Sequence, residues 1–239
     1  MPSPRIVWIT GASSGIGRSL VEIFVQHGDT VAASARRIVL LEALQKDLSS
    51  APGTCRLFPC DVGEESQVAT VGEAILKEFG AVDFLVNCAG VTSFKSFLGT
   101  TTQEFDEVVR TNLRGLFLTT KAVLPDMIER GNGVVMNILS YAGKVTYTGS
   151  SAYAAAKSGA EAMMDVVRAE TRDKGIKIVN VSPGAVLTPI WHDKQRERYG
   201  HLMMKPVEVA KLLYEISLQP ASMMIEDIII RPQIGDLKV

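Results

Sequence analysis

The sequence predicts an α/β fold in which one doubly wound parallel sheet of about seven strands has helices on both faces. Short runs rich in β-branched residues alternate along the chain with longer helical patterns. The short runs have no polar face, as in strands that are buried on both sides. Glycine, which favours the left-handed conformation at helix ends, follows four of the helical patterns. Repeated β-α-β units of this length connect parallel strands.

The expected strands and helices follow one another in alternation. Strands are expected at residues 5–10, 30–34, 56–60, 82–87, 133–139, 177–181 and 225–231. Helices are expected at residues 15–26, 38–48, 64–79, 101–130 and 151–174, and a last helix begins near Pro206. The glycines expected to end helices are Gly28, Gly80, Gly131 and Gly175.

The composition is that of a folded globular chain. Of its 239 residues, 46% are hydrophobic and 21% are charged, and 25 Lys and Arg oppose 26 Asp and Glu for a net charge of −1. A disordered chain has fewer apolar residues, and a nucleic-acid partner requires a concentrated basic surface, so both classes are excluded. No run approaches the roughly 18 apolar residues of a membrane helix, and the N-terminus lacks a signal-peptide core. The protein is therefore expected in the cytoplasm.

The chain is expected to form one catalytic domain over residues 1–239. No linker, low-complexity tract or repeat interrupts the pattern, and α/β folds reach about 250 residues as one domain. Residues 187–205 are the one long stretch without clear periodicity. Because such a segment in a compact domain is usually functional, it is predicted to be a substrate lid.

The three cysteines are expected to be free thiols. Cys55, Cys60 and Cys88 are odd in number and lack C-x-x-C spacing. This pattern favours neither a disulfide framework nor a zinc site, so no metal is predicted.

A glycine-rich turn joins the first strand to the first helix, with G-x-x-x-G-x-G spacing over Gly11, Gly15 and Gly17. Glycine lets the backbone approach a phosphate closely, and a helix N-terminus favours an anion. A dinucleotide pyrophosphate fits this turn; a purely structural turn is the alternative. The spacing differs from G-x-G-x-x-G, and a phosphate-loop NTPase would need Gly and Lys where Ile16 and Gly17 stand.

Two arginines follow the second strand, at the position where NAD enzymes carry an acidic residue for the ribose 2′-hydroxyl. The sequence there reads Ser34-Ala35-Arg36-Arg37. Guanidinium groups suit a 2′-phosphate, so NADP(H) is favoured over NAD(H). The alternative is that Arg36 and Arg37 are solvated charges before a helix.

Tyr153 and Lys157 are spaced i, i+4 near the start of an expected helix, so their side chains share a face. A phenol has a pKa of about 10, and a nearby ammonium group can lower it toward neutrality. Ser140 ends the fifth strand, at the edge of a parallel sheet where ligands bind. Its hydroxyl can hydrogen-bond a substrate carbonyl while Tyr153 delivers a proton, which is the division of labour that carbonyl reduction requires.

These residues resemble the short-chain dehydrogenase/reductase family, which has a Rossmann-type fold. The motifs match in order across nearly the whole chain: Thr10-Gly11-x-x-x-Gly15-x-Gly17, Asn87-Cys88-Ala89-Gly90, Asn112, Ser140, Tyr153-x-x-x-Lys157 and Pro183-Gly184. The resemblance implies that Tyr153 is the general acid/base and that Lys157 lowers its pKa and holds the nicotinamide ribose. It also implies that Ser140 orients the carbonyl and that Asn112 holds a water in a proton relay to Lys157.

The resemblance also implies the cofactor contacts, with Asp61 at the adenine ring. The expected cofactor residues are Gly11, Ser13, Ser14, Gly15, Ile16, Gly17, Arg36, Arg37, Asp61, Val62, Asn87, Ala89, Gly90, Tyr153, Lys157, Pro183, Gly184, Val186 and Thr188. Two departures occur. Cys88 stands where many members have a second Asn, in a turn that mainly stabilises the sheet. Residues 226–233 lack the Asp-Gly-Gly of many members and resemble NADP-dependent hydroxy-acid dehydrogenases and sepiapterin-reductase-like enzymes.

Aromatic and methionine side chains near the expected site could line an apolar substrate pocket. They are Phe94, Phe97, Tyr141, Tyr147, Trp191, Tyr199, Met203 and Met204. The lid also carries basic residues that could attract a carboxylate or phosphate or could be solvated loop charges, namely His192, Lys194, Arg196, Arg198 and His201.

The two long helices at 101–130 and 151–174 carry more apolar residues than one sheet face needs. On the first helix these include Leu116, Phe117, Leu118, Val123 and Leu124. In the family the equivalent helices pair between subunits, so a homotetramer is expected, with a homodimer as the next alternative.

The sequence therefore predicts an NADP(H)-dependent carbonyl reductase or alcohol dehydrogenase. Such an oxidoreductase interconverts a small-molecule ketone or aldehyde with an alcohol by hydride transfer. One alternative is a regulator that binds NADP without turnover, which would not need Ser140, Asn112, Tyr153 and Lys157 all intact. Another is a sugar-nucleotide epimerase or dehydratase, a class that shares Tyr-x-x-x-Lys but has a different glycine spacing and a C-terminal substrate domain.

Overall fold

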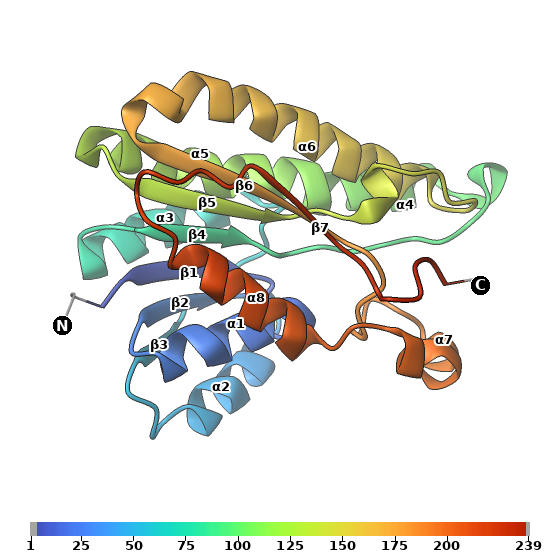
Figure 1. Ribbon diagram of the computed structural model, residues 1–239, viewed down its shortest axis with the longest axis horizontal. Coiled ribbons are helices and arrows are strands. Elements are labelled where there is room, and N and C mark those ends of the chain that lie inside the picture. Colours follow the sequence, from blue (N-terminus) through green and yellow to red (C-terminus); the bar gives the residue numbers. More distant parts are fainter. Residues whose placement is uncertain (1–3, 238–239) are drawn as a thin grey trace.

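The computed structural model describes residues 4–237 and contains a seven-stranded sheet (Figure 1). The strand order is β3-β2-β1-β4-β5-β6-β7, and neighbouring strands are parallel. The strands are β1 (Ile6–Thr10), β2 (Thr30–Ser34), β3 (Thr54–Leu57), β4 (Phe84–Asn87), β5 (Gly133–Ile138), β6 (Ile176–Pro183) and β7 (Asp227–Ile230). The doubly wound parallel sheet is confirmed. The predicted domain limits at residues 1 and 239 lie outside the described residues.

Helices cover both faces of this sheet (Figure 1). Helices α1, α2 and α8 lie on one face, and α3, α5 and α6 lie on the other. The helices are α1 (Gly15–Gln26), α2 (Ile38–Asp47), α3 (Glu65–Phe79), α4 (Thr102–Val109), α5 (Gly115–Arg130), α6 (Ser151–Thr171), α7 (Asp193–Tyr199) and α8 (Pro206–Ser217). None of them, within residues 4–237, is long and apolar enough to cross a bilayer.

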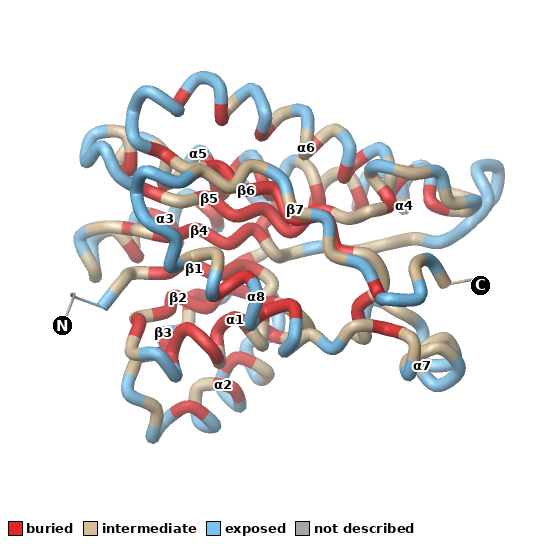
Figure 2. Tube along the Cα trace, in the orientation of Figure 1, coloured by how far each residue is buried: buried red, intermediate tan, exposed pale blue. Residues whose placement is uncertain are grey.

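Strand β1 shows why the short runs have no polar face. Val7 and Ile9 pack toward α1 and α8, whereas Trp8 between them packs toward α3 and α5. All three side chains are fully buried, and Figure 2 shows the central strands as buried. Burying an apolar side chain of this size stabilises the fold by about 1.5–3 kcal/mol, so both faces of the sheet contribute to the core.

The four glycines expected at helix ends all adopt positive φ. The angles are 92° at Gly28, 81° at Gly80, 65° at Gly131 and 75° at Gly175. This backbone region is open to glycine without steric cost, so these predicted helix ends are confirmed.

The expected helix at 101–130 contains an interruption. A π-helical turn, η2 (Arg110–Arg114), separates α4 from α5. Such a turn holds an extra residue and changes the direction of its side chains, and it is frequent at functional sites. Hydrophobic periodicity did not reveal it.

Two other segments differ from the expectation. Residues 187–205 contain the short helix α7, whose DKQRERY sequence has no apolar stripe that could reveal it. Strand β3 begins at Thr54 and ends at Leu57, not at 56–60, because its ladder with β2 ends where Ala33 faces Leu57.

Candidate active site

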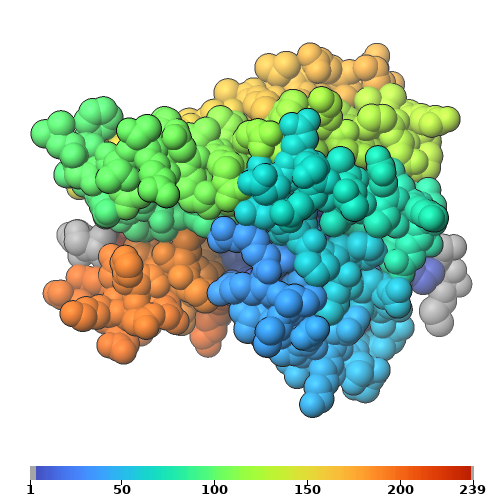
Figure 3. Space-filling view, turned by 180° about the vertical axis from the view of Figure 1, so that it is seen from behind, coloured from blue at the N-terminus to red at the C-terminus, as the bar shows by residue number. Residues whose placement is uncertain are grey.

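The carboxyl ends of the strands border a cleft of about 950 Å³. It lies where the strand order reverses between β1 and β4, the usual ligand position in open α/β sheets. In Figure 3 the surface is hollowed where blue, green and orange parts of the chain meet. The predicted cofactor residues that line this cleft are Gly11, Ser13, Ser14, Gly15, Ile16, Arg36, Arg37, Asp61, Val62, Ala89, Gly90, Tyr153, Lys157, Pro183, Gly184, Val186 and Thr188.

The turn between β1 and α1 leaves no room for side chains at its glycines. A Cβ on Gly11 would lie 2.8 Å from the backbone of Ala89, and one on Gly17 would lie 2.4 Å from the Gly11 carbonyl oxygen. Gly17 therefore packs beneath the turn. Ser14, the N-cap residue of α1, makes no side-chain capping hydrogen bond. The first amides of α1 thus remain available to an anion, and the turn fits a dinucleotide pyrophosphate.

The two arginines after β2 take different positions at the cleft. The Arg37 guanidinium donates to the hydroxyls of Ser13 at 3.0 Å and Ser14 at 3.2 Å, so it lies over the glycine turn. The Arg36 side chain is 54% exposed and points toward α4, where its nearest carboxylate oxygen, on Glu107, is 3.5 Å away. Both cations border the same end of the cleft, which suits a phosphate.

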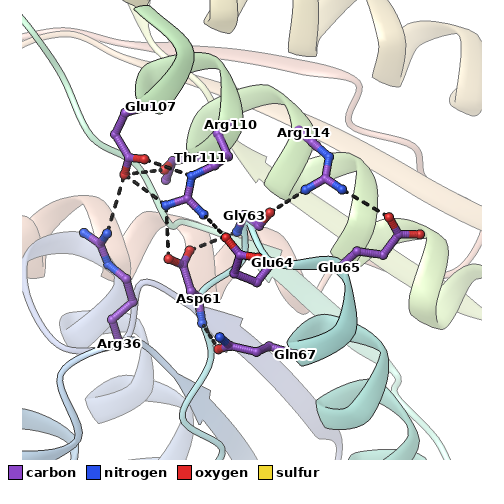
Figure 4. Close-up of polar contacts among 10 residues, drawn as sticks. All are labelled: Arg36, Asp61, Gly63, Glu64, Glu65, Gln67, Glu107, Arg110, Thr111 and Arg114. Atoms are coloured by element: carbon purple, nitrogen blue, oxygen red, sulfur yellow. Dashed lines mark hydrogen bonds and ion pairs between the residues drawn. The ribbon is translucent and has the colours of Figure 1, made fainter. Parts of the chain in front are cut away.

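Asp61 lies at this end of the cleft, on the loop between β3 and α3 (Figure 4). Its carboxylate accepts hydrogen bonds from the Gly63 N–H at 3.0 Å and from the Arg110 guanidinium at 3.1 Å. Burial works against the ionised form, but these donors outweigh it and lower the pKa of Asp61. Asp61 is therefore a fixed, ionised acceptor beside Val62 and Thr111, which also line the cleft.

The structure brings Ser140, Tyr153 and Lys157 together at the opposite end. Ser140 follows β5, and the other two lie on the first turns of α6. Tyr153 is 8% exposed and Lys157 is 5% exposed. The Lys157 ammonium donates to the carbonyl oxygen of Ile138 at 2.8 Å and lies 5.7 Å from the centre of the Tyr153 ring. The predicted shared face of the helix is confirmed.

The ionisation of this pair differs from the expectation. Burial raises the pKa of Tyr153 to about 12, against the opposing effect of the Ser140 hydroxyl. Burial also lowers the pKa of Lys157 to about 8. The phenol pKa is therefore raised and not lowered as predicted, because desolvation of the Tyr153 side chain dominates the net shift.

Asn112 lies in the π-helical turn, beside the cleft. Its amide N–H groups donate to the carbonyl oxygens of Val91 at 2.8 Å and Val108 at 2.9 Å. Its Oδ1 atom is buried and has no hydrogen-bond partner in residues 4–237. A Cβ on Gly90 would lie 2.9 Å from this oxygen and 3.7 Å from Lys157 Nζ. Glycine thus keeps a gap between the two side chains, which also line a small cavity of about 10 Å³.

Asn87 does not line the cleft but belongs to a buried ladder of asparagines across β4, β5 and β6. Its amide donates to Asn137 at 3.0 Å, and the Asn137 amide donates to Asn180 at 3.0 Å. The Thr119 hydroxyl donates to Asn87 at 2.6 Å. Because buried amides are costly unless paired, this ladder fixes the register of the strands beneath the site.

Aromatic side chains surround the cleft near Tyr153. The Phe94 ring stacks on Trp191 with centroids 5.7 Å apart, and it meets Tyr153 edge to face at 6.2 Å. The Tyr147 hydroxyl donates to Asp236 at 2.5 Å. Tyr141 also lines this part. Four of the residues predicted for the substrate pocket therefore line the cleft.

Other expected pocket residues lie elsewhere. Phe97 is 79% exposed, and Met203 and Met204 pack against core residues, since a bridge joins Val186 to Met204. Tyr199 is outside the cleft and stacks with Arg198. The basic lid residues do not line the cleft either, and Arg196 pairs with Asp193.

Sequence reasoning missed part of the cleft wall. Gln195 of α7 and Asp236 and Leu237 of the C-terminal segment line it. These residues carry no motif, and only the fold brings the C-terminal segment to the cleft.

Comparison with known proteins extends these observations. The chain matches the family model described as short chain dehydrogenase over residues 5–199. It is 31% identical over 241 residues to a sepiapterin reductase of Chlorobaculum tepidum, with 98% of each chain covered. It is 32% identical over 239 residues to glycine betaine reductase ATRR of Emericella nidulans; this match covers 97% of the chain but 19% of that protein.

A solved structure supports the same likeness. The alcohol dehydrogenase from the archaeon Thermococcus sibiricus, complexed with 5-hydroxy-NADP, superposes with a TM-score of 0.90 at 25% identity. The match covers 99% of this chain and 100% of that one.

Proposed function

The chain belongs to the short-chain dehydrogenase family, and we propose that it is an NADP(H)-dependent oxidoreductase that interconverts a ketone or aldehyde with an alcohol. One observation carries this proposal. Ser140, Tyr153 and Lys157 converge at one end of a cleft whose other end is bordered by Arg36 and Arg37. The glycine turn lies between these ends. The family assignment does not favour an epimerase or dehydratase.

In this proposal Tyr153 is the general acid/base. A bound nicotinamide cofactor supplies or takes up the hydride. With its pKa raised to about 12, the Tyr153 phenol is protonated at neutral pH and can donate its proton to a carbonyl oxygen during reduction. The Ser140 hydroxyl hydrogen-bonds the same oxygen and orients it. Below the lowered Lys157 pKa of about 8, the ammonium group carries a positive charge that favours the phenolate left behind.

Asn112 and Lys157 form the route by which the proton is replaced. The unpartnered Oδ1 of Asn112 and the nearby ammonium of Lys157 face the gap that Gly90 leaves open. A cavity of about 10 Å³ is at the lower limit for one water molecule. We propose that a water held here links Lys157 to solvent.

The cofactor preference follows from the arginines. The sequence at the end of β2 offers no carboxylate for a ribose 2′-hydroxyl, and Arg36 and Arg37 supply two guanidinium groups for a 2′-phosphate. The site therefore favours NADP(H) over NAD(H). The remaining predicted cofactor residues along the cleft hold the pyrophosphate, the nicotinamide ribose and the carboxamide.

The substrate half of the cleft suits an apolar carbonyl compound. Phe94, Trp191 and Tyr147 wall it next to Tyr153. Residues 187–205, which include α7, form the lid in this proposal. Exposed apolar side chains on α5 and α6, such as Phe117 and Val166, support the predicted homotetramer or homodimer. A cytoplasmic location stays a prediction from the sequence.

A panel of ketones, aldehydes and β-keto esters, assayed by NADPH absorbance, tests the proposal. We expect steady NADPH consumption with some members. Tyr153→Phe removes only the phenolic hydroxyl and should lower turnover about 10³-fold. NADPH binding, followed by its fluorescence, should be retained in that variant. Tight NADPH binding without turnover on any carbonyl or alcohol would favour the regulator instead.

A further inference from the structure

An ion-pair cluster at the adenine end of the cleft is centred on Arg110, the first residue of the π-helical turn (Figure 4). Its guanidinium contacts Glu107 at 2.8 Å, Glu64 at 3.0 Å and Asp61 at 3.1 Å. Glu107 lies on α4, and the other two carboxylates lie between β3 and α3. Arg110 thus joins two segments that are distant in the sequence, with its side chain 27% exposed.

The loop is shaped for this guanidinium. A Cβ on Gly63 would lie 2.2 Å from Nη1 and 2.7 Å from Cζ of Arg110. Any side chain at position 63 would therefore displace the guanidinium from its carboxylates. The pKa of Arg110 is raised, first by its hydrogen bond to Glu107 and further by Asp61, so its charge is fixed.

Arg36 and Arg110 meet at one carboxylate oxygen. Glu107 Oε1 lies 3.5 Å from Arg36 Nη1 and accepts a hydrogen bond from Arg110 Nη2 at 3.2 Å. The Arg110 Nε group also donates to Glu107 Oε2 at 2.8 Å. Glu107 is therefore held in two-point contact by Arg110, whereas its contact with Arg36 is longer and exposed. This leaves the Arg36 guanidinium available at the rim of the cleft.

We propose that Arg110 determines cofactor specificity by holding Glu107, so that Arg36 is free to bind the 2′-phosphate of NADP(H). This inference rests on the proposed NADP(H)-dependent function. Arg110 does not itself line the cleft, so it acts as a positioning residue through Arg36. Without Arg110, the Glu107 carboxylate would keep Arg36 as its one remaining ion-pair partner among the described residues, and it would draw Arg36 away from the phosphate.

The contact between Arg110 and Asp61 acts differently. Asp61 lies where the adenine ring is expected, and NADPH and NADH share that ring. Any disturbance of Asp61 therefore changes the affinity for both cofactors alike. Only the ratio of the two dissociation constants reports on Arg36 and the 2′-phosphate.

The test is a fluorescence titration of the purified full chain with NADPH and with NADH, which needs no substrate. Arg110→Met removes the charge but keeps an unbranched side chain. We expect the Kd for NADPH to rise about fivefold more than the Kd for NADH. With any active carbonyl substrate, kcat at saturating NADPH should stay within about twofold, because separate carbonyl groups hold Asn112.

Glu107→Gln provides the rescue. In the Arg110→Met background it removes the carboxylate that competes for Arg36, and we expect it to restore most of the preference for NADPH. Alone, it should tighten NADPH binding about twofold relative to NADH. This single variant keeps the test decisive if Arg110→Met unfolds, because an unchanged ratio in Glu107→Gln would then overturn the inference.

Arg114 is the matched control. It lies in the same π-helical turn and holds the same loop through the Gly63 carbonyl oxygen and Glu65, but it has no contact with Glu107. Arg114→Met should leave the NADPH to NADH ratio unchanged. An equal shift in this variant would show general loosening of the loop and would overturn the inference.

Two results separate this inference from the proposed function. If the wild-type chain prefers NADPH and Arg110→Met leaves that preference intact, the role of Arg110 is wrong while the proposed function stands. If the wild-type chain binds NADH as tightly as NADPH, the proposed cofactor preference fails, and the role of Arg110 fails with it.

Discussion

The two ends of the cleft contrast in how they control charge. At the catalytic end Tyr153 and Lys157 are 8% and 5% exposed, and burial shifts the pKa of both. At the adenine end Arg36 is 54% exposed, and its environment is set by the ion pairs around Glu107 and Arg110. In the proposed function, desolvation therefore tunes proton transfer at one end, and competition among surface charges tunes cofactor choice at the other.

The sheet explains this division. Tyr153 and Lys157 lie on α6, and Ser140 follows β5 near the middle of the sheet, where elements pack on several sides. Arg36 follows β2, and Asp61 follows the edge strand β3. Substitutions at the central end should change turnover and stability, and those at the edge should change relative cofactor affinity.

Arg36→Asp gives the largest expected effect at the exposed end. It reverses a charge beside the expected 2′-phosphate, so the Kd for NADPH should rise about 50-fold more than that for NADH. Turnover at saturating cofactor should change little. Fluorescence titration and steady-state kinetics with both cofactors measure these effects.

Arg56→Asp is its control, because Arg56 is also 54% exposed and ion-paired but lies outside the cleft. This substitution should leave the ratio of the dissociation constants for NADPH and NADH unchanged. If Arg36→Asp had the same kinetics as the wild type with NADPH, and also with NADH, Arg36 would not belong to the phosphate site.

Much of the buried end was predictable from local sequence. The i, i+4 spacing of Tyr153 and Lys157 determines a shared helix face, and the position of Ser140 after an apolar run places it at the sheet edge. The glycine turn was likewise predictable from its spacing, and the structure leaves no space for a Cβ at Gly11 or Gly17.

The exposed end was less predictable. Arg110 lies in a π-helical turn that periodicity does not reveal, and two of its three carboxylate partners, Asp61 and Glu64, come from a loop that is distant in the sequence. Asp236 reaches the cleft only because the chain after β7 folds back past Tyr147. Even at the buried end, the sequence spacing places Lys157 beside Tyr153 but does not show how deeply the two side chains are buried. This burial raises the pKa of Tyr153, whereas the sequence predicted a lower one.

Lys157→Met tests the buried end through stability. The pKa of Lys157 is lowered from 10.5 to about 8. Between these values the unfolded chain binds a proton that the folded chain has lost, so this lysine makes the wild type more stable as the pH rises through that window. Relative to Lys157→Met, the wild type should gain about 1–2 kcal/mol in free energy of unfolding between pH 8 and 9.5.

Urea unfolding of both proteins at several pH values measures this difference. Groups away from Lys157 ionise alike in the two proteins and cancel, and Tyr153, with its pKa raised to about 12, is protonated in the folded wild type throughout this window. The exposed Lys211 on α8 is the control, and Lys211→Met should keep the wild-type pH dependence. Parallel pH profiles for Lys157→Met and the wild type would contradict the burial of a charged amine.

Salt gives the smallest expected effect and compares both ends in one experiment. Mobile ions weaken interactions between exposed charges, and the distance beyond which these are largely screened is about 8–10 Å near physiological ionic strength; buried groups are screened much less. Raising NaCl from 50 to 300 mM should weaken NADPH binding about threefold more than NADH binding, because only NADPH carries the 2′-phosphate. Turnover at saturating NADPH should stay nearly constant, since Tyr153 and Lys157 are buried. In Arg36→Asp, NADPH binding should depend on salt no more strongly than NADH binding does. If salt instead lowered turnover and left the cofactor ratio unchanged, the catalytic end would be the solvent-exposed one, and the contrast between the two ends would be wrong.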